Sequence, residues 1–253
     1  MIFKLIHGGV KENLVLTTIL REWRRRHPQD AILLETSRPE IFIGNADVTA
    51  VGSWKEDAAV IDFDILEVPS FDMHIMDIYA FAAFGDNRLL SRRMVTGYPI
   101  APCHGVQLLM GMRFVEEHSG IVFAIHEKYD AFILEYAPAE IEDALARLSS
   151  SAVYVGCDED ATWLAMATDI PIVMLTGPYQ PKNVRPFREG LPFESVAGKC
   201  EFMRDCIKKS SSMFGNVYYP NCRNSKKQAC EVGITSDDVL AAIDRIVKKE
   251  VSS

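Results

Sequence analysis

Residues 1–18 read MIFKLIHGGVKENLVLTT, and this stretch decides the fold. An apolar strand is expected over Met1–His7, it runs into Gly8-Gly9, and a helix is expected over Leu14–Arg26. In an open α/β sheet, ligands bind at the carboxyl ends of the strands, where N–H groups at a helix start face outward. The chain therefore opens on a candidate ligand site.

The composition is that of an ordinary globular protein, with 253 residues, 48% hydrophobic and 25% charged. The net charge of −8 argues against a general nucleic-acid or anionic-membrane surface, because both need clustered positive charge. The basic run Arg21–Arg26 is interpreted as a solvated helix end. No apolar run has the length of a membrane span and the start lacks a signal-peptide layout, so a cytoplasmic protein is expected.

Strands alternate with helices along the first half, which predicts βαβ units and a parallel sheet. Further strands are expected over 31–35, 48–51 and 58–66, and helices over 39–44 and 73–84. Residues 86–102 carry glycine and prolines without a clear period, and we interpret them as a connection between domains.

A second α/β unit is expected in the remaining chain, with 1–102 as the first domain and 103–253 as the second. Expected helices cover 105–117, 139–148, 161–168 and 236–249, and expected strands cover 121–125, 152–156 and 171–176. Residues 177–232 contain five prolines and four cysteines and are expected to be irregular.

Several motifs in this order resemble family 9 glycosyltransferases, the group that includes the ADP-heptose heptosyltransferases. The first comprises the opening strand, the glycine turn and the basic helix that ends at His27-Pro28, and Asn45-Ala46-Asp47-Val48 follows it. His74–Tyr79 and the unit 152–178 continue the resemblance, which covers about two-thirds of the chain and extends to Arg185-Pro186 and Cys230.

The resemblance implies a GT-B architecture: two Rossmann-like domains with mostly parallel sheets, the second one shortened. The first domain would bind the acceptor and the second an ADP-heptose-like nucleotide sugar. A general base would deprotonate an acceptor hydroxyl, and no metal would be needed for the chemistry. The implied function is transfer of a sugar, with a heptose as one candidate, to an acceptor that the sequence does not identify.

Carried onto this chain, the resemblance gives two sets of candidate residues. The catalytic candidates are His7, Glu12 and Asn13. The substrate-binding candidates come from the two strand–turn–helix units and the segment after the last strand: Gly8, Gly9, Thr17, Asp158, Glu159, Trp163, Thr176, Gly177, Pro178, Lys182 and Arg185.

The chain departs from the family pattern at several of these positions. The usual Gly-Asp stands as Glu12-Asn13, and an asparagine cannot accept a proton at neutral pH. The nucleotide loop has Glu159, Asp160 and Trp163 where the family has Ser or Thr, Gly and His, and carboxylates repel a diphosphate. No counterpart of the family's strand, phosphate-contacting loop and Lys-x-Trp helix is evident between Tyr98 and Ile121, which would leave the donor wall incomplete.

Four cysteines in the segment 200–230 are candidate ligands for a structural Zn or Fe ion: Cys200, Cys206, Cys222 and Cys230. Their spacing contains no CxxC knuckle, so four reduced thiols are the alternative. Cys103 and Cys157 are interpreted as packing residues, and Asp62, Asp64 and Glu67 as the solvent face of a strand.

Three functions remain open from the sequence. The first is a glycosyltransferase with Glu12 or His7 as its base. The second is a catalytically degenerate relative that acts as a binding or assembly protein, which Asn13, Glu159 and Asp160 favour. The third is another sugar or nucleotide enzyme on the same scaffold. A homo-oligomer that completes the site from a second subunit is an intermediate case.

Overall fold

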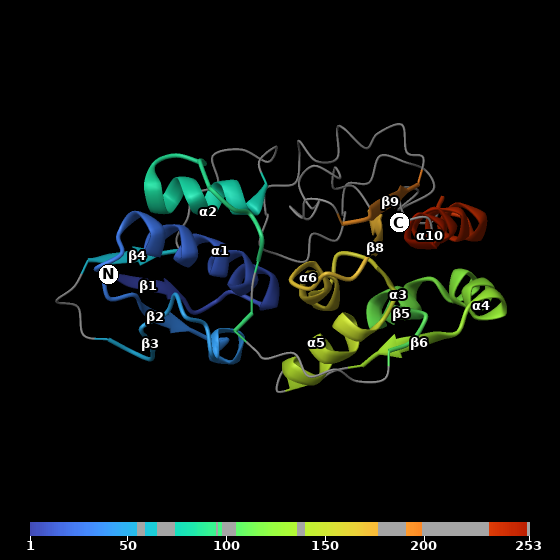
Figure 1. Cartoon of the computed structure of the whole chain (residues 1–253), viewed down its shortest axis with the longest axis horizontal. Coiled ribbons are helices and arrows are strands. Elements are labelled where there is room, and N and C mark those ends of the chain that lie inside the picture. The colour runs from blue at the N-terminus through green and yellow to red at the C-terminus, as the bar shows by residue number, and fades with distance from the viewer. Residues whose placement is uncertain are drawn as a thin grey trace, which may run out of the picture.

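A computed structural model of the chain describes residues 1–54, 59–64, 74–94, 96–97, 105–135, 140–176, 191–198 and 233–251. Two α/β units lie side by side, the first in blue and cyan and the second in green to red (Figure 1). Each contains one fully parallel sheet. The expected α/β class with two Rossmann-like units is confirmed, whereas the expected boundary at 102/103 falls outside the described residues.

The first sheet has the strand order β3-β2-β1-β4, formed by β1 (Ile2–Leu5), β2 (Leu33–Thr36), β3 (Ala50–Val51) and β4 (Val60–Asp62). Its strands are joined by α1 (Val10–Arg26) and the 3-10 helix η1 (Pro39–Phe42), and α2 (Ile75–Phe84) follows β4. Alternate strand residues, including Phe3 and Leu34, are buried in one apolar cluster with α1 and α2.

The second sheet has the order β6-β5-β7-β8-β9. Its strands are β5 (Leu108–Gly111), β6 (Ala131–Leu134), β7 (Val153–Gly156), β8 (Ile172–Thr176) and β9 (Phe193–Ala197). Its helices are α3 (Met112–Glu117), α4 (Ser119–Lys128), α5 (Ile141–Ser150), α6 (Asp160–Met166) and α10 (Ser236–Val251).

Both faces of the second sheet are buried, because successive strand residues enter different apolar clusters. Tyr154 and Met174 pack with α5 and α6, whereas Val155 and Val173 pack with α4 and α10. The cluster on the α5–α6 face is continuous with the core of the first unit. It joins the two units where α1 contacts α6.

The sequence prediction was wrong at the start of the second unit. Residues 108–111 form β5 instead of the first half of a helix, and 121–125 lie within α4 instead of a strand. β6 and β9 were not predicted, and β9 falls inside the segment expected to be irregular. A strand and a helix, β5 and α3, therefore precede Ile121, and α3 does not carry a Lys-x-Trp pattern.

Local sequence explains two helix ends directly. α2 ends at Gly85, which adopts φ +71°, the left-handed conformation typical of a helix C-terminus. α10 begins at a reciprocal cap, in which the Asp238 N–H donates to the Thr235 hydroxyl and the Thr235 hydroxyl donates to the Asp238 carboxylate. Within the described part of the chain, no helix is long and apolar enough to span a membrane.

Candidate functional site

Each sheet has one point where its strand order reverses. The chain leaves β1 toward β2 and later returns to β4 on the other side, and it leaves β5 toward β6 and returns to β7. Ligands of open parallel sheets bind at the carboxyl ends of the strands that flank such a point. The candidate positions are therefore the turns after β1 and β4 in one unit and after β5 and β7 in the other.

A carboxylate holds the first of these points together. Asp64, just after β4, accepts the backbone N–H groups of Ile6 at 2.7 Å and His7 at 2.8 Å. The interpretation of Asp64 as a solvent-facing strand residue is therefore wrong. The His7 side chain is exposed at this turn. A Cβ on Gly8 would lie 2.8 Å from Leu5 Cγ, so the turn requires glycine there.

Glu12 and Asn13 have different environments in the first turn of α1. Asn13 is 0% exposed, and its amide donates to the carbonyls of Gly8 (3.1 Å) and Gly9 (2.8 Å). Its side-chain oxygen accepts the Thr36 hydroxyl at 2.5 Å. Glu12 is partly exposed and accepts the Gly9 N–H at 2.9 Å. Asn13 is thus built into the turn, whereas Glu12 presents a carboxylate at the surface.

The turn after β7 is organised around Asp158 and Trp163. Asp158 Oδ1 accepts the indole N–H of Trp163 at 2.8 Å, and Trp163 is buried in α6. Thr162 donates to the Cys157 carbonyl at 2.5 Å and shares a hydrogen bond with the Tyr154 hydroxyl. Cys157 is buried, and burial, with the Glu159 carboxylate nearby, raises the pKa of its thiol, which agrees with its expected packing role.

Glu159 bridges the second reversal point much as Asp64 bridges the first. Its Oε2 accepts the backbone N–H of Arg113, just after β5, at 3.0 Å. Its Oε1 lies 3.5 Å from the Cys157 N–H. Burial raises the pKa of Glu159, and the Arg113 N–H partly offsets this effect. In both units, a carboxylate of the chain itself therefore accepts backbone N–H groups at the strand ends.

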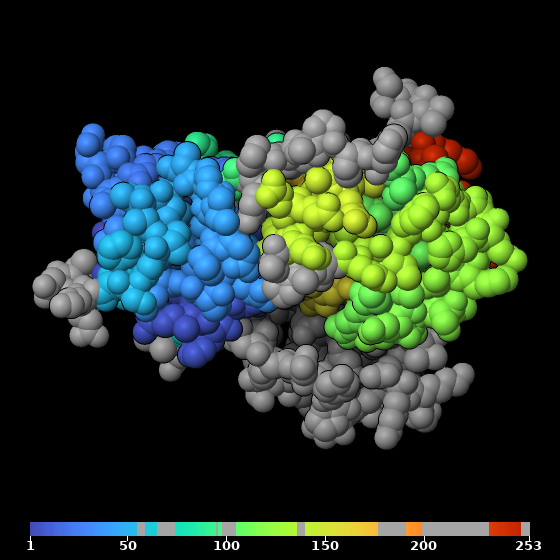
Figure 2. Space-filling model, turned by 90° about the horizontal axis from the view of Figure 1, so that it is seen from below, coloured from blue at the N-terminus to red at the C-terminus, as the bar shows by residue number. Residues whose placement is uncertain are grey.

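The two sets of turns meet where α1 contacts α6. Lys11 Nζ lies 3.7 Å from Asp158 Oδ2 and 4.8 Å above the centre of the Trp163 ring. Figure 2 shows the blue first unit against the yellow segment of the second. We call the region bounded by residues 7–13 and 157–163 the crevice. Its charges are mixed, with Lys11 and Glu12 facing Asp158 and the exposed Asp160.

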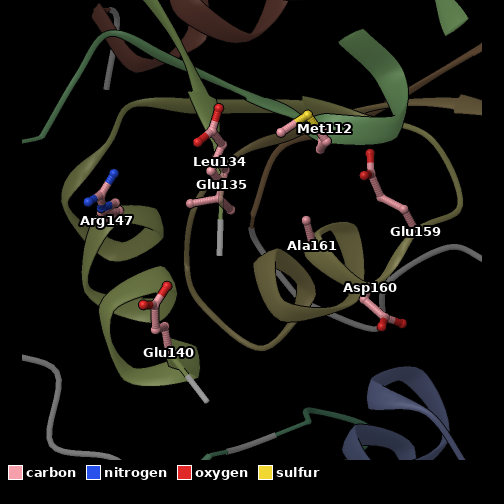
Figure 3. Close-up of a pocket in the computed structure, with 8 residues that line it drawn as sticks. All are labelled: Met112, Leu134, Glu135, Glu140, Arg147, Glu159, Asp160 and Ala161. Atoms are coloured by element: carbon pink, nitrogen blue, oxygen red, sulfur yellow. The ribbon is translucent and has the colours of Figure 1, made fainter. Parts of the chain in front are cut away.

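A pocket of about 540 Å³ opens beside the crevice in the second unit. Glu140 lines it from just before α5 and Arg147 from within α5, Glu159 and Asp160 line it at the start of α6, and Glu135 follows β6 (Figure 3). Three apolar residues complete the lining: Met112, Leu134 and Ala161. Arg147 pairs with Asp143 at 3.0 Å, so the pocket wall is predominantly acidic.

Several sequence-predicted site residues lie elsewhere. Thr17 is 0% exposed inside α1 and donates to the Leu14 carbonyl, and Thr176 is buried in β8 and donates to the Val196 carbonyl. Gly177, Pro178, Lys182 and Arg185 lie outside the described residues. The sequence prediction did not include Lys11, Asp64 and Arg113, because their partners are distant in sequence.

The four candidate metal ligands Cys200, Cys206, Cys222 and Cys230 also lie outside the described residues. Within the ranges that the structure describes, no group of three or more His, Cys, Asp or Glu side chains is placed to hold a metal ion.

Two α/β units, each with one parallel sheet, give the chain a GT-B-like fold. No family model and no curated protein matches the sequence. Among solved structures, the chain is similar to a dodecameric iron-containing heptosyltransferase, TibC, in complex with ADP-D-β-D-heptose. The TM-score is 0.76 at 12% identity, over 100% of this chain and 78% of that one.

Other glycosyltransferase structures have the same fold at similar identity. A family 9 glycosyltransferase from Veillonella parvula gives a TM-score of 0.61 at 11% identity, covering 98% of this chain and 97% of that one. The E. coli ADP-heptose lipopolysaccharide heptosyltransferase II gives a TM-score of 0.60 at 12% identity, covering 98% of this chain and 99% of that one. The expected resemblance to heptosyltransferases is confirmed at the level of fold.

Proposed function

We propose that this protein transfers a sugar from a nucleotide-sugar donor to an acceptor hydroxyl in the crevice, with ADP-heptose as the first donor to test. The observation that carries the proposal is the pairing of Lys11 with Asp158, which brings the carboxyl ends of both parallel sheets to one place. The donor class comes from structures of the same fold, one of which contains ADP-D-β-D-heptose.

The pocket beside the crevice suits the nucleoside part of such a donor. Its volume of about 540 Å³ is within the usual range for a small-molecule site. Carboxylates such as those of Glu135 and Glu140 accept hydrogen bonds from ribose hydroxyls, and Met112, Leu134 and Ala161 offer apolar contact to a base. The pocket adjoins Glu159 and Asp160, so a nucleoside there would direct its phosphates toward the crevice.

Glu12 is the general base in this proposal. Its carboxylate would take the proton from the acceptor hydroxyl as that oxygen attacks the anomeric carbon, while the bond from this carbon to the diphosphate oxygen breaks. Asn13 cannot serve, because its amide already bonds to Gly8 and Gly9 and its oxygen accepts from Thr36. His7 is the alternative base, since its side chain is exposed at the same turn.

The test is the release of ADP from ADP-heptose with an acceptor panel, for wild type, Glu12→Gln and His7→Gln. A general base contributes about 10²- to 10⁴-fold to the rate, so Glu12→Gln should lose about that factor while donor affinity stays within about twofold. Glu117→Gln is the control, because Glu117 pairs with Arg113 on the exposed side of α3. Unchanged turnover in Glu12→Gln would remove Glu12 from this role.

A second candidate function is ligand binding without transfer. It is favoured by Glu159, which already accepts the Arg113 N–H at a strand end where a phosphate would otherwise find a donor. It predicts nucleotide binding with neither transfer nor hydrolysis of the donor. The same turnover assay separates the two functions.

Metal binding and assembly complete the proposal. TibC is described as iron-containing and dodecameric. We propose that Cys200, Cys206, Cys222 and Cys230 bind iron or zinc in this chain and that it forms a homo-oligomer. Metal analysis of the purified protein and light scattering test these two points directly.

A further inference from the structure

We infer that Lys11 is the cation that binds the donor's diphosphate, and that it exchanges Asp158 for the diphosphate when the donor enters the crevice. The inference rests on the proposed function and adds the residue that makes an acidic crevice accept an anionic ligand. The lysine comes from the unit expected to bind the acceptor.

The inference starts from an electrostatic problem. Asp158, Glu159 and Asp160 follow one another at the start of α6, and a diphosphate beside them would be repelled. The strand-end N–H groups offer a diphosphate few hydrogen bonds, because Asp64 accepts those of Ile6 and His7 and Glu159 accepts that of Arg113. A diphosphate in this crevice therefore needs a cationic side chain.

Most described cations at the crevice or the pocket already pair with carboxylates on their own segment. Arg38 pairs with Glu40, Arg113 with Glu117 and Arg147 with Asp143. Lys11 differs, because its ion pair with Asp158 joins the two units at the crevice, and the separation of 3.7 Å is long for a direct hydrogen bond. The diphosphate of a nucleotide sugar carries two negative charges, one on each phosphate, and therefore offers this ammonium a stronger partner than Asp158 does.

Lys11 is also held in place for this exchange. Its ammonium lies 4.8 Å above the buried Trp163 ring, and that ring is fixed by the bond from its N–H to Asp158 Oδ1. The cation–π contact persists when the anionic partner changes. The side chains of Lys11 and Asp158 are 25% and 26% exposed, so a ligand can reach the pair. Asp160, two residues after Asp158, lines the adjoining pocket on the side of the first unit, whose ribbon is blue (Figure 3).

Calorimetric titration of the full-length protein with ADP and with adenosine tests the inference. Lys11→Gln should weaken ADP binding by about 10- to 100-fold, the usual value of a charge-assisted hydrogen bond, and leave adenosine binding unchanged. Asp158→Asn keeps an acceptor for the Trp163 indole and removes the competing charge, so ADP should bind more tightly. Lys4→Gln is the matched control, because Lys4 pairs with Asp62 at 3.5 Å and lies outside the two segments that bound the crevice.

The outcomes separate this inference from the proposed function. If wild type binds ADP and Lys11→Gln binds it equally well, Lys11 is not the diphosphate ligand, although donor binding stands. If Lys11→Gln weakens the binding of ADP and of adenosine by the same factor, Lys11 acts only on the shape of the site and the inference is wrong. If wild type binds neither compound, both the inference and the proposed donor site are wrong.

Discussion

Glu159 Oε2 accepts the backbone N–H of Arg113 at 3.0 Å, so the turn after β7 is bonded to the turn after β5. Asp64 makes the equivalent connection in the first unit, to Ile6 and His7. At both reversal points of this fold, a carboxylate of the chain itself therefore accepts backbone N–H groups at the strand ends. These bonds fix the turns that form the crevice, and they give the first prediction.

Glu159→Ala should destabilise the protein by about 1–2 kcal/mol, because it leaves the Arg113 N–H without this partner. Glu159→Gln keeps an acceptor for that N–H and should therefore lower the free energy of unfolding by less. Urea denaturation of both variants measures the difference. Equal losses in the two variants would show that the bond to Arg113 contributes little.

The pH dependence of Glu159 follows from its raised pKa. Burial raises the pKa in the folded state above the ordinary value of 4.5, so the folded state holds the proton more tightly than the unfolded state does. The contribution of this group to stability is then largest below pH 4.5 and falls as the pH rises through the folded pKa. The stability of wild type relative to Glu159→Gln should decrease over that window, and an increase would contradict this account.

Asn13→Asp tests whether restoring a carboxylate at the position of the usual family base restores a base. Asn13 is 0% exposed and donates to two carbonyls, so an aspartate there would lose both bonds and face two oxygens. We expect a loss of about 2–3 kcal/mol in the free energy of unfolding and no gain in sugar transfer. Asn87→Asp, at an exposed position, is the control and should change stability by less than about 0.5 kcal/mol. A stable and more active Asn13→Asp variant would overturn the assignment of Glu12.

Glu22 gives an acid-sensitive contact at the end of α1. It is 3% exposed and accepts hydrogen bonds from Arg25 (3.0 Å) and Arg26 (2.8 Å), and these, led by that of Arg25, lower its pKa to about 2. Because the pKa is lower in the folded state, this stabilisation is present above pH 4.5 and is lost as the pH falls toward 2. Glu22→Gln should cost about 2 kcal/mol at pH 7, allowing for solvent screening of the exposed Arg25, and little at pH 2. A pH series of urea denaturations checks this, and a constant difference would contradict it.

These contacts also show that the basic run at the end of α1 is more than a solvated face. Arg24 donates to the carbonyls of Asp30 and Asp47, and Arg26 also pairs with Asp86. The arginines therefore fasten the end of α1 to neighbouring loops. The net charge of the whole chain could not reveal these partners.

Sequence patterns predicted the units β1–α1 and β7–α6 because each has an apolar strand, a turn and a helix in immediate succession. The prediction was wrong over 108–111 and 121–125 for a local reason, whereas the helix predicted over 112–117 is present as α3. Leu108–Gly111 is a strand of four residues that is buried on both faces, so it shows no alternation. Ile121 and Ile125 have helical spacing, with Phe123 exposed between them, but their β-branched composition favoured a strand.

The candidate site was predicted only in part, for a different reason. Glu12 and Asp158 belong to local turns that the sequence displays. Lys11 belongs to the site because its ammonium contacts Asp158 and Trp163. Asp64 belongs to it because its carboxylate accepts the backbone N–H groups of Ile6 and His7. Such pairs join segments that are distant in sequence, and no local periodicity records them.

Hydrogen–deuterium exchange with and without ADP-heptose tests the central claim most directly, because it monitors both turns in one experiment. If one crevice binds the donor, peptides covering residues 6–12 and 156–161 should both gain protection in the presence of ligand. Protection confined to one of the two turns, or absent from both at saturating donor, would contradict a shared crevice.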